Sequence, residues 1–296
     1  MNLMYSRFEA LDNYSLKEIQ GSTVAVVGLG ATGSVMAEHL ARHGVKLILI
    51  DRDFLERNDL YSSNIYTGNQ VEKALPKAKA CEKTLSELTE VEAYIEDLNS
   101  KNVELLGSTD LIMDGTDNLE TRYLLDDYSK ANDVPWIYTA ALGERGFSMY
   151  LNETCFKCTF DSLNPKKSCE TNGVLREISV IAASKSCLKA LKYLSGEEVD
   201  EKLEILPENQ KFEVQDCECG EQRDFEASNV CGENKYQVFG DSGPEKFGGQ
   251  ILASNSYLKK LEFEGHLITV FQSGRAIVEA QSLEDAKRLY RTASSI

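Results

Sequence analysis

Hydrophobic residues in the first half of the chain follow two patterns in turn, short unbroken runs and helical spacing. The runs at residues 22–28 and 46–51 are rich in β-branched side chains and have no polar face, which is typical of buried parallel strands. Between them, residues 31–43 place Val35, Met36 and Leu40 on one face, as an amphipathic helix does. The same patterns predict strands at residues 92–98, 109–117, 135–141 and 146–152, and helices within 1–20 and at 75–89 and 118–132.

This alternation of strands and helices predicts an α/β fold. Parallel strands joined through helices require right-handed crossovers. We therefore expect a doubly wound, mainly parallel, Rossmann-like sheet, in which ligands bind at the carboxyl ends of the strands.

The pattern changes after residue 152. Residues 153–172 predict an irregular, cysteine-bearing crossover region, and residues 197–230 are charged and rich in loop formers. Between these segments, residues 173–196 predict a long helix that ends at Gly196. Its apolar residues at helical spacing are Val174, Ile178, Ile181, Leu188 and Leu191. We expect one large domain over residues 1–229.

The remaining residues, 230–296, predict a small α+β module at the C-terminal end. Strands are expected at residues 235–239, 266–271 and 274–280, with a turn at Ser273 and Gly274. Helices are expected near residues 250–263 and at 282–293.

Composition narrows the classes of function. The chain has 296 residues, of which 42% are hydrophobic, which is enough for a full core. Its formal net charge of −16 argues against a nucleic-acid or anionic-membrane partner, because phosphates would be repelled. There is no apolar run near the ~18–20 residues that span a bilayer, and no signal-peptide pattern at the start, so we expect a cytoplasmic location. The eight cysteines should then be mostly reduced.

A glycine-rich loop between the first two predicted strands indicates a nucleotide site. Gly28, Gly30 and Gly33 form G-x-G-x-x-G, which permits a tight turn and close approach of a phosphate to the backbone. The helix that follows offers free N–H groups to an anion. Asp51, at the end of the second strand, can accept hydrogen bonds from two ribose hydroxyls. This pattern alone fits NAD as well as ATP.

Two further features favour ATP. Lys77 stands at a predicted helix start, where the helix dipole repels a cation unless an anion lies nearby. The segment DGTDN places Asp114 and Asp117 at the carboxyl end of a strand. An enzyme that splits ATP needs a cation on the phosphates and a carboxylate for Mg²⁺, whereas hydride transfer needs neither. An exposed lysine and a helix-capping Asp117 are the alternatives.

The sequence resembles the ThiF/MoeB/HesA superfamily, adenylating enzymes related to ubiquitin-activating enzyme. The resemblance rests on YSRF, VGLGATGS, IDRDF, NDL, LPKAKA, DGTDNLETRYLLDD, PWIYTAALGERG, CFKC and SCETNGVL, in this order, up to about residue 196. It implies that Asp51 and Asp53 lie at the ribose, Lys77 at the phosphates, and Asp117 on Mg²⁺ with Asn118 beside it. It further implies that Arg7 reaches the phosphates from the other subunit of a homodimer. The other implied nucleotide contacts are Gly28, Gly30, Ala31, Gly33, Asn58 and Ser62.

One position departs from the family pattern. The family usually has N-L-Q-R-Q at residues 59–63, where the arginine contacts the nucleotide, but this chain has DLYSS with Ser62 at that position. A charge-assisted bond of this kind contributes about 1.5–3 kcal/mol. Either another residue replaces it, or adenylation is slow or altered.

Cysteine spacing suggests zinc. Cys155 and Cys158 form C-x-x-C, and tetrahedral zinc sites combine two such pairs. The family has its second C-x-x-C downstream, where this chain offers Cys217 and Cys219, with Asp216 in place of one cysteine. The alternative is a set of reduced thiols. A redox pair is disfavoured, because C-F-K-C is not expected to open a helix after a strand.

Cys169 matches the crossover-loop cysteine that, in sulfur-carrier enzymes of the family, can form a thioester or acyl-disulfide. Lys166 and Lys167 nearby would favour its thiolate; the alternative is a bystander thiol. Cys231 is interpreted as structural, and Cys81 and Cys187 as core residues. No zinc-ligand spacing joins the cysteines to the three histidines, His39, His43 and His266.

The resemblance implies an adenylyltransferase that uses ATP, Mg²⁺ and a structural Zn²⁺. Its partner would be a small ubiquitin-like protein ending in Gly-Gly, whose carboxylate becomes an acyl-adenylate. A sulfur donor could then yield a thiocarboxylate for molybdopterin or thiamine synthesis or tRNA thiolation; conjugation to a target lysine is the other outcome. A weakly active, scaffold-like member and an NAD(P)-dependent oxidoreductase are the alternatives.

Overall fold

The computed structural model describes residues 3–161, 173–208, 210–212, 227–229, 235–238, 240, 242–254, 258–271 and 276–295. The chain divides into two compact units, which are described separately. The first contains residues 1–117 and 121–219, and the second contains residues 118–120 and 220–296.

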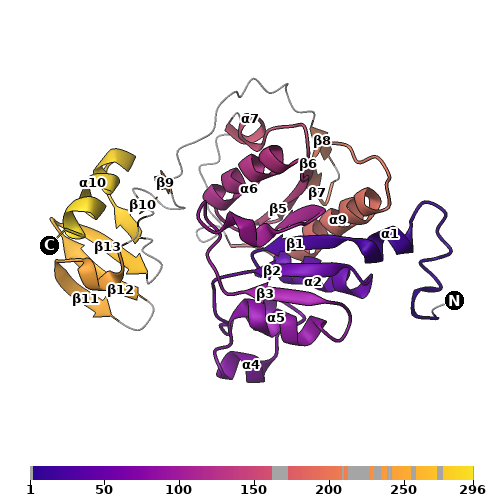
Figure 1. Ribbon diagram of the computed structural model, residues 1–296, viewed down its shortest axis with the longest axis horizontal. Coiled ribbons are helices and arrows are strands. Elements are labelled where there is room, and N and C mark those ends of the chain that lie inside the picture. The colour runs from indigo at the N-terminus through magenta and orange to yellow at the C-terminus, as the bar shows by residue number, and fades with distance from the viewer. Residues whose placement is uncertain are drawn as a thin grey trace. The chain divides into compact units, whose positions relative to one another are not determined.

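The first unit is built on an eight-stranded sheet (Figure 1). Its strand order is β3-β2-β1-β4-β5-β6-β7-β8, parallel from β3 to β5 and antiparallel from β5 to β8. The strands are β1 (Thr23–Val27), β2 (Lys46–Ile50), β3 (Val91–Tyr94), β4 (Leu111–Asp114), β5 (Trp136–Leu142), β6 (Arg145–Leu151), β7 (Leu203–Leu206) and β8 (Gln210–Phe212). The chain winds outward in both directions from β1 and β4, which confirms the predicted doubly wound, mainly parallel sheet.

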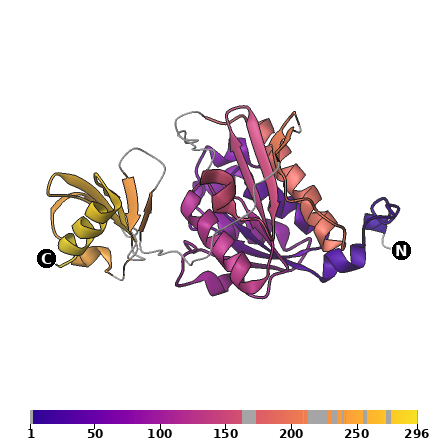
Figure 2. The ribbon, with the colours of Figure 1, turned by 90° about the horizontal axis from the view of Figure 1, so that it is seen from above.

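Helices cover both faces of this sheet (Figures 1 and 2). Those that pack on the sheet are α2 (Gly33–Arg42), α5 (Lys77–Leu85), α6 (Leu119–Asn132), the short α7 (Phe156–Asp161) and α9 (Arg176–Leu194). On one face, α2 packs between α5 and α9. On the other, Phe156 and Phe160 of α7 contact the rings of Trp136 and Tyr138 in β5. The short helices are η1 (Leu3–Tyr5), α1 (Leu16–Gly21), α3 (Asp59–Ser62), α4 (Gly68–Glu72) and η2 (Val103–Leu106).

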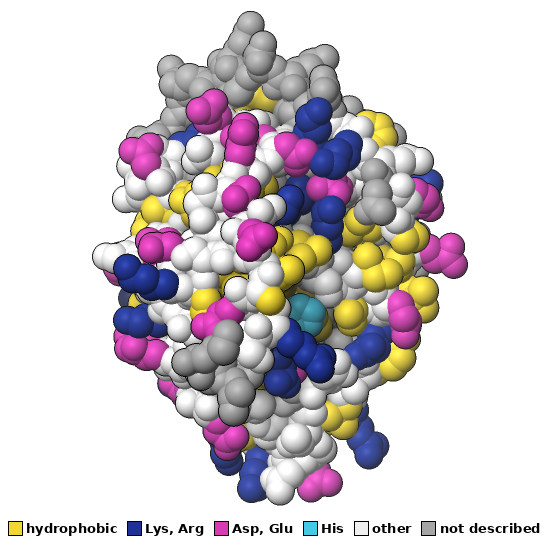
Figure 3. Space-filling view, turned by 90° about the vertical axis from the view of Figure 1, so that its right-hand side faces the viewer, with side chains coloured by type: hydrophobic (Ala, Val, Ile, Leu, Met, Phe, Trp, Pro, Cys, Tyr) yellow, Lys and Arg dark blue, Asp and Glu magenta, His cyan; other side chains and the backbone are white. Residues whose placement is uncertain are grey.

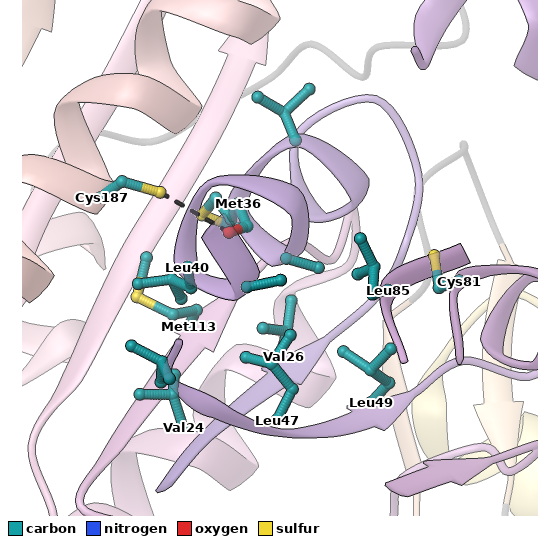
Figure 4. Packing of buried hydrophobic residues seen from close by; sticks show 14 of the residues in the cluster. Val24, Val26, Met36, Leu40, Leu47, Leu49, Cys81, Leu85, Met113 and Cys187 are labelled. Atoms are coloured by element: carbon teal, nitrogen blue, oxygen red, sulfur yellow. Dashed lines mark hydrogen bonds between the residues drawn. The ribbon is translucent and has the colours of Figure 1, made fainter. Parts of the chain in front are cut away.

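The core between α2, α5, α9 and the sheet is formed by the residues that the hydrophobic pattern selects. Val35, Met36 and Leu40 of α2 are almost wholly buried against Val24 and Leu47 of the sheet (Figure 4). Cys81 and Cys187 lie in this core, which confirms their interpretation as core residues, and the Cys187 thiol donates to the Met36 carbonyl at 3.8 Å. Burial raises the pKa of both thiols, to about 12 for Cys81, so both stay protonated at neutral pH.

Helix α9 forms as predicted, and Ile178 and Leu191 are buried as expected, but two other residues of the predicted inner face are not. Ile181 and Leu188 are 40% and 51% exposed. The helix packs against the sheet through small side chains, and Gly146 of β6 leaves room for Ala182. Close helix–sheet contact requires small residues, so the large apolar side chains identified only part of the buried face.

Two segments expected to be irregular contain regular structure. Residues 156–161 form α7, and β7 and β8 within residues 197–230 extend the sheet. These strands are short, and β8 is exposed along its length, so the hydrophobic pattern carries little sign of them.

The second unit contains a six-stranded antiparallel sheet in the order β11-β12-β13-β14-β10-β9. Its elements are β9 (Ala227–Asn229), β10 (Lys235–Val238), η3 (Pro244–Lys246), β11 (Gln250–Ser254), β12 (Leu258–Phe263), β13 (His266–Phe271), β14 (Ala276–Glu279) and α10 (Leu283–Ala293). The helix expected near residues 250–263 is wrong, because this stretch forms the hairpin strands β11 and β12. In β12 the side chains alternate, with Leu261 buried and Lys260 and Glu262 exposed, whereas Ile251 and Leu252 of β11 are both exposed.

Charge is mixed over the surface in view. On the face in Figure 3, acidic side chains are interspersed with basic and hydrophobic ones. Among the described helices, none has the length and hydropathy needed to cross a membrane.

Candidate nucleotide site

The glycine loop leaves the carboxyl end of β1, where the sheet connections diverge. Gly28 has a φ of +81°, and a Cβ there would lie 2.8 Å from the carbonyl carbon of Gly115. A Cβ on Gly115 would lie 2.5 Å from the Gly28 carbonyl oxygen, and one on Gly33 would overlap that same oxygen. The three backbones are therefore in contact. Gly30 is different, because a Cβ there would meet no atom within 4 Å.

Asp51 ties the end of β2 to this loop. Its carboxylate accepts the Leu29 N–H at 2.5 Å and the Asp53 N–H at 2.7 Å. Burial raises its pKa to about 6, although these hydrogen bonds oppose the shift. The Tyr66 hydroxyl donates to the Leu29 carbonyl at 2.7 Å and so holds the loop from the other side.

Lys77 stands at the first position of α5, as the sequence predicts. Its N–H donates to the Asp53 carbonyl at 2.8 Å, and its Nζ lies 3.1 Å from Oδ1 of Asp59. Burial lowers the pKa of Lys77, but Asp51, Asp59 and Asp53 raise it above its ordinary value. The structure thus brings Asp51, Asp53 and Lys77 together and adds Asp59, which sequence reasoning did not select.

The DGTDN segment divides its two aspartates between different environments. Asp114 is fully buried and accepts Arg122 Nε at 2.9 Å and the Thr116 N–H at 2.9 Å. Arg122 also donates to the Thr116 carbonyl and lies over the Tyr138 ring. Asp114 therefore holds the loop in shape. Asp117 is exposed three residues further on, just before α6, with half-buried Asn118 beside it.

Arg52 is another residue that sequence reasoning missed. It forms an ion pair with Asp97 at 2.7 Å. Burial lowers its pKa, but Asp97, Asp53 and Asp117 raise it above the ordinary value. Arg52 thus lies within electrostatic range of Asp117, at the carboxyl edge of the sheet.

The segment with the missing family arginine forms the short helix α3. Asn58 precedes it, and half-buried Ser62 ends it, with Oγ 3.4 Å from the Asp59 carbonyl. Two residues later, Asn64 Oδ1 accepts Nη2 of Arg176 at 2.6 Å. A cation from the start of α9 is therefore brought beside this segment, which the sequence pattern gave no means of predicting.

Arg7 is not brought to the site of its own chain. It is exposed, and its neighbour Phe8 packs against the His43 ring at 5.1 Å. His43 caps the end of α2 that is remote from the glycine loop. The ten residues of α2 span about 15 Å, so Arg7 lies toward the opposite edge of the sheet.

The cysteine predictions fall only partly within the described residues. Cys155 is buried, and its thiol donates to Asp126 Oδ2 at 3.5 Å. Helix α7 begins directly after Cys155, so the expectation that C-F-K-C does not open a helix is wrong, and that reason against a redox pair is lost. The described residues include no group of three or more metal-binding side chains. The predicted ligands and reactive thiol that lie outside them are Cys169, Asp216, Cys217 and Cys219.

Comparison with known proteins then decides the family. A family model described as ThiF matches residues 3–228. The chain belongs to the ThiF family. The sulfur carrier protein ThiS adenylyltransferase of Bacillus subtilis is 28% identical and aligns over 97% of this chain and 97% of its own length. The enzyme of the same name from Escherichia coli is 28% identical over 66% of this chain and 82% of that relative.

Longer ThiF relatives match only in part. Adenylyltransferase and sulfurtransferase MOCS3 of Arabidopsis thaliana is 29% identical over 67% of this chain, and the match covers 46% of that protein. Among solved structures, E. coli MccB with ATP gives a TM-score of 0.62 at 16% identity, covering 73% of this chain and 72% of that one. At this identity the likeness shows the fold alone.

Proposed function

We propose that the protein is an ATP-dependent adenylyltransferase that activates the C-terminal carboxylate of a small ubiquitin-like sulfur carrier protein ending in Gly-Gly. The observation that carries the proposal is the cluster of Lys77, Asp51 and the glycine loop at one edge of the sheet. An oxidoreductase has no use for Lys77 in this position. The full-length match to a ThiS adenylyltransferase supports the choice of substrate class.

The residues present fit ATP. Asp51 would accept the ribose hydroxyls, with Asp53 beside it. The phosphates would follow the loop at Gly30 and Ala31 toward the start of α2, where the helix dipole favours an anion. The open space at Gly30 leaves room for that approach. Lys77 would neutralise phosphate charge.

Asp117, at the carboxyl end of β4, would supply a carboxylate for Mg²⁺. Its oxygen donors are of the kind that Mg²⁺ takes, and Asn118 adds an amide oxygen nearby. The ion would withdraw negative charge from the phosphates when bound. Asp114 is not proposed as a ligand, because Arg122 and Thr116 occupy its carboxylate.

The reaction needs positioning and charge neutralisation more than acid–base catalysis. A carboxylate oxygen of the carrier protein forms a bond to the α-phosphorus, and the bond to the bridging oxygen breaks, which releases pyrophosphate. The attacking group is already an anion at neutral pH, so no side chain has to remove a proton. The ammonium of Lys77 offsets the charge that gathers on the leaving pyrophosphate.

Three finer assignments belong to the same proposal. Cys169 would accept the acyl group from the adenylate, or a sulfur donor would attack the adenylate directly. Cys155 and Cys158 would hold a structural zinc with Cys217 and Cys219, a donor set that zinc takes. Arg7 would complete the site of a second subunit in a homodimer, since α2 separates it from the site of its own chain.

A weakly active, scaffold-like role is the second candidate. One observation favours it: the segment at residues 58–64 lacks the family arginine and instead places the carboxylate of Asp59 against Lys77. This lowers the positive charge available to a triphosphate.

Pyrophosphate exchange into ATP tests the proposal. The assay uses labelled pyrophosphate, MgATP and, in turn, each small protein of the same genome that ends in Gly-Gly. Wild type and the variant Asp117→Ala are compared. Exchange that depends on one carrier protein and is lost in the variant supports adenylation and names the partner. Wild type that binds MgATP but exchanges with none of them favours the scaffold role.

A further inference from the structure

The ammonium of Lys77 has a carboxylate partner within its own chain. The side chains of Lys77 and Asp59 are only 13% and 8% exposed, and Nζ lies 3.1 Å from Oδ1. Attraction between opposite charges is stronger in such a shielded place than in water. Any other anion that uses Lys77 must compete with Asp59.

The carboxylate of Asp59 is held in place from its other side. Its second oxygen, Oδ2, accepts the Glu56 N–H at 2.8 Å, at the start of α3. Asp59 therefore cannot leave Lys77 by a simple side-chain rotation without losing this hydrogen bond.

Two further carboxylates lie within electrostatic range of Lys77. Asp51 and Asp53 also act electrostatically on Lys77, although Asp53 is shared with Arg52, whose Nε lies 3.7 Å from its Oδ1. Phosphates that arrive at Lys77 meet the charge of Asp59 at close range. When they bind, a phosphate replaces the Asp59 carboxylate at Lys77. The electrostatic free energy gained is therefore smaller than for a lysine without such a partner.

We propose that Asp59 is a positioning residue that competes with the ATP phosphates for Lys77 and so weakens nucleotide binding. Asp59 forms its ion pair with Lys77 again as pyrophosphate dissociates, which speeds product release. This inference rests on the proposed function, because it requires phosphates at Lys77.

The variant Asp59→Asn tests the inference. Asparagine keeps the shape and an oxygen that can accept the Glu56 N–H, and it removes only the charge. Isothermal titration calorimetry with MgATP should give a dissociation constant about tenfold lower than that of wild type. In the exchange assay, pyrophosphate should reach half-saturation at a lower concentration for the same reason. The affinity for adenosine, which has the ribose but no phosphate, should not change.

Asp110→Asn is the matched control. The Asp110 carboxylate also accepts a backbone N–H, that of Thr23 at 2.8 Å, but at the opposite edge of the sheet. The Asp110→Asn variant removes one negative charge, as Asp59→Asn does, and its affinity for MgATP should equal that of wild type.

The outcomes separate the inference from the proposed function. If wild type binds MgATP and Asp59→Asn binds it equally or more weakly, Asp59 does not compete and the inference is wrong. An equal gain in adenosine affinity would also overturn it, since that indicates a change in the shape of the site. If wild type does not bind MgATP, the proposed function fails, and the inference fails with it.

Discussion

Arg122 and Asp114 form an ion pair inside the protein, with Nε 2.9 Å from Oδ2, at the point where β4 ends. Their side chains are 9% and 0% exposed. Burial lowers the pKa of Arg122, but Asp114 raises it above its ordinary value, whereas burial raises the pKa of the Asp114 carboxyl although Arg122 and Thr116 oppose that shift. The pair fixes the loop that carries Gly115 and Asp117.

Removal of one partner leaves the other charge buried. We expect Arg122→Met to lower the free energy of unfolding by about 3–5 kcal/mol, measured by urea denaturation. Lys79→Met removes a lysine from an exposed ion pair with Glu82 and should change the free energy of unfolding by about 0.5 kcal/mol or less. Equal effects of the two variants would contradict the structural role given to Arg122.

The glycines of the nucleotide loop should separate stability from binding. Gly115→Ala pushes a methyl group onto the Gly28 backbone and should cost about 2–3 kcal/mol of stability. Gly30→Ala meets open space, so we expect it to fold with a stability within about 0.5 kcal/mol of wild type. Its affinity for MgATP should nevertheless fall at least about tenfold, because the methyl would stand where the phosphates approach. Normal MgATP binding by Gly30→Ala would place the phosphates elsewhere.

The raised pKa of Asp51, about 6, predicts opposite pH effects on binding and stability. Below pH 6 the carboxyl becomes protonated and accepts ribose hydroxyls less well, so MgATP affinity should fall. Stability should rise over the same range, because the pKa of Asp51 in the folded state exceeds its ordinary value of 3.8 and the folded state binds the proton more tightly. From pH 4 to pH 7, wild type should lose about 2–3 kcal/mol relative to Asp51→Asn. If the free energies of urea unfolding of the two proteins change equally with pH, the raised pKa of Asp51 is refuted.

Arg176 should replace part of the positive charge that the family arginine supplies at the position of Ser62. Val174 pairs with Gly143 just beyond the end of β5, which places Arg176 near the carboxyl edge of the sheet. We expect Arg176→Ala to raise the KM for MgATP about three- to tenfold and Ser62→Arg to restore it in that background. Asn64→Ala, which removes only the partner of Arg176, is the control and should leave KM unchanged. An equal rise in KM for this control would mean that Arg176 acts by holding Asn64.

Metal content tests the zinc assignment without reference to activity. Mass spectrometry of the purified protein should find about one zinc ion per chain. Cys155→Ser and Cys158→Ser should lose it, and a chelator should lower the stability of wild type. Cys231→Ser, which changes a cysteine outside the proposed set, should keep the ion. Full zinc in Cys158→Ser would exclude that residue as a ligand.

Much of the fold could be predicted because its strands are buried on both faces. Val24 and Leu47 lie in unbroken apolar runs, and the glycines between them mark the turn. The spacing of large side chains, however, predicted only part of the buried face of α9, since contact with the sheet there also depends on Ala182 and other small residues. The hairpin of β11 and β12 was taken for a helix, because its apolar residues fit either period over a short stretch.

The candidate site was predictable where a residue type is tied to a chain position. Lys77 at a helix start and Asp51 at a strand end are of this kind. Asp59 and Arg122 are not, because their importance depends on partners remote in the sequence, Lys77 for one and the loop after β4 for the other. Arg176 reaches its partner across more than one hundred residues. Local patterns do not contain such pairings.

The backbone contact among Gly28, Gly33 and Gly115 also restricts how this sequence can diverge. An added methyl group at any of the three meets peptide backbone, so no substitution of a neighbouring side chain can make room for it. Gly146 differs, because its nearest obstacle is the Cβ of Ala182, which a change to glycine would remove. Paired substitutions at Gly146 and Ala182 can therefore be tolerated during evolution. At the nucleotide loop, even a single substitution of one of the three glycines is excluded.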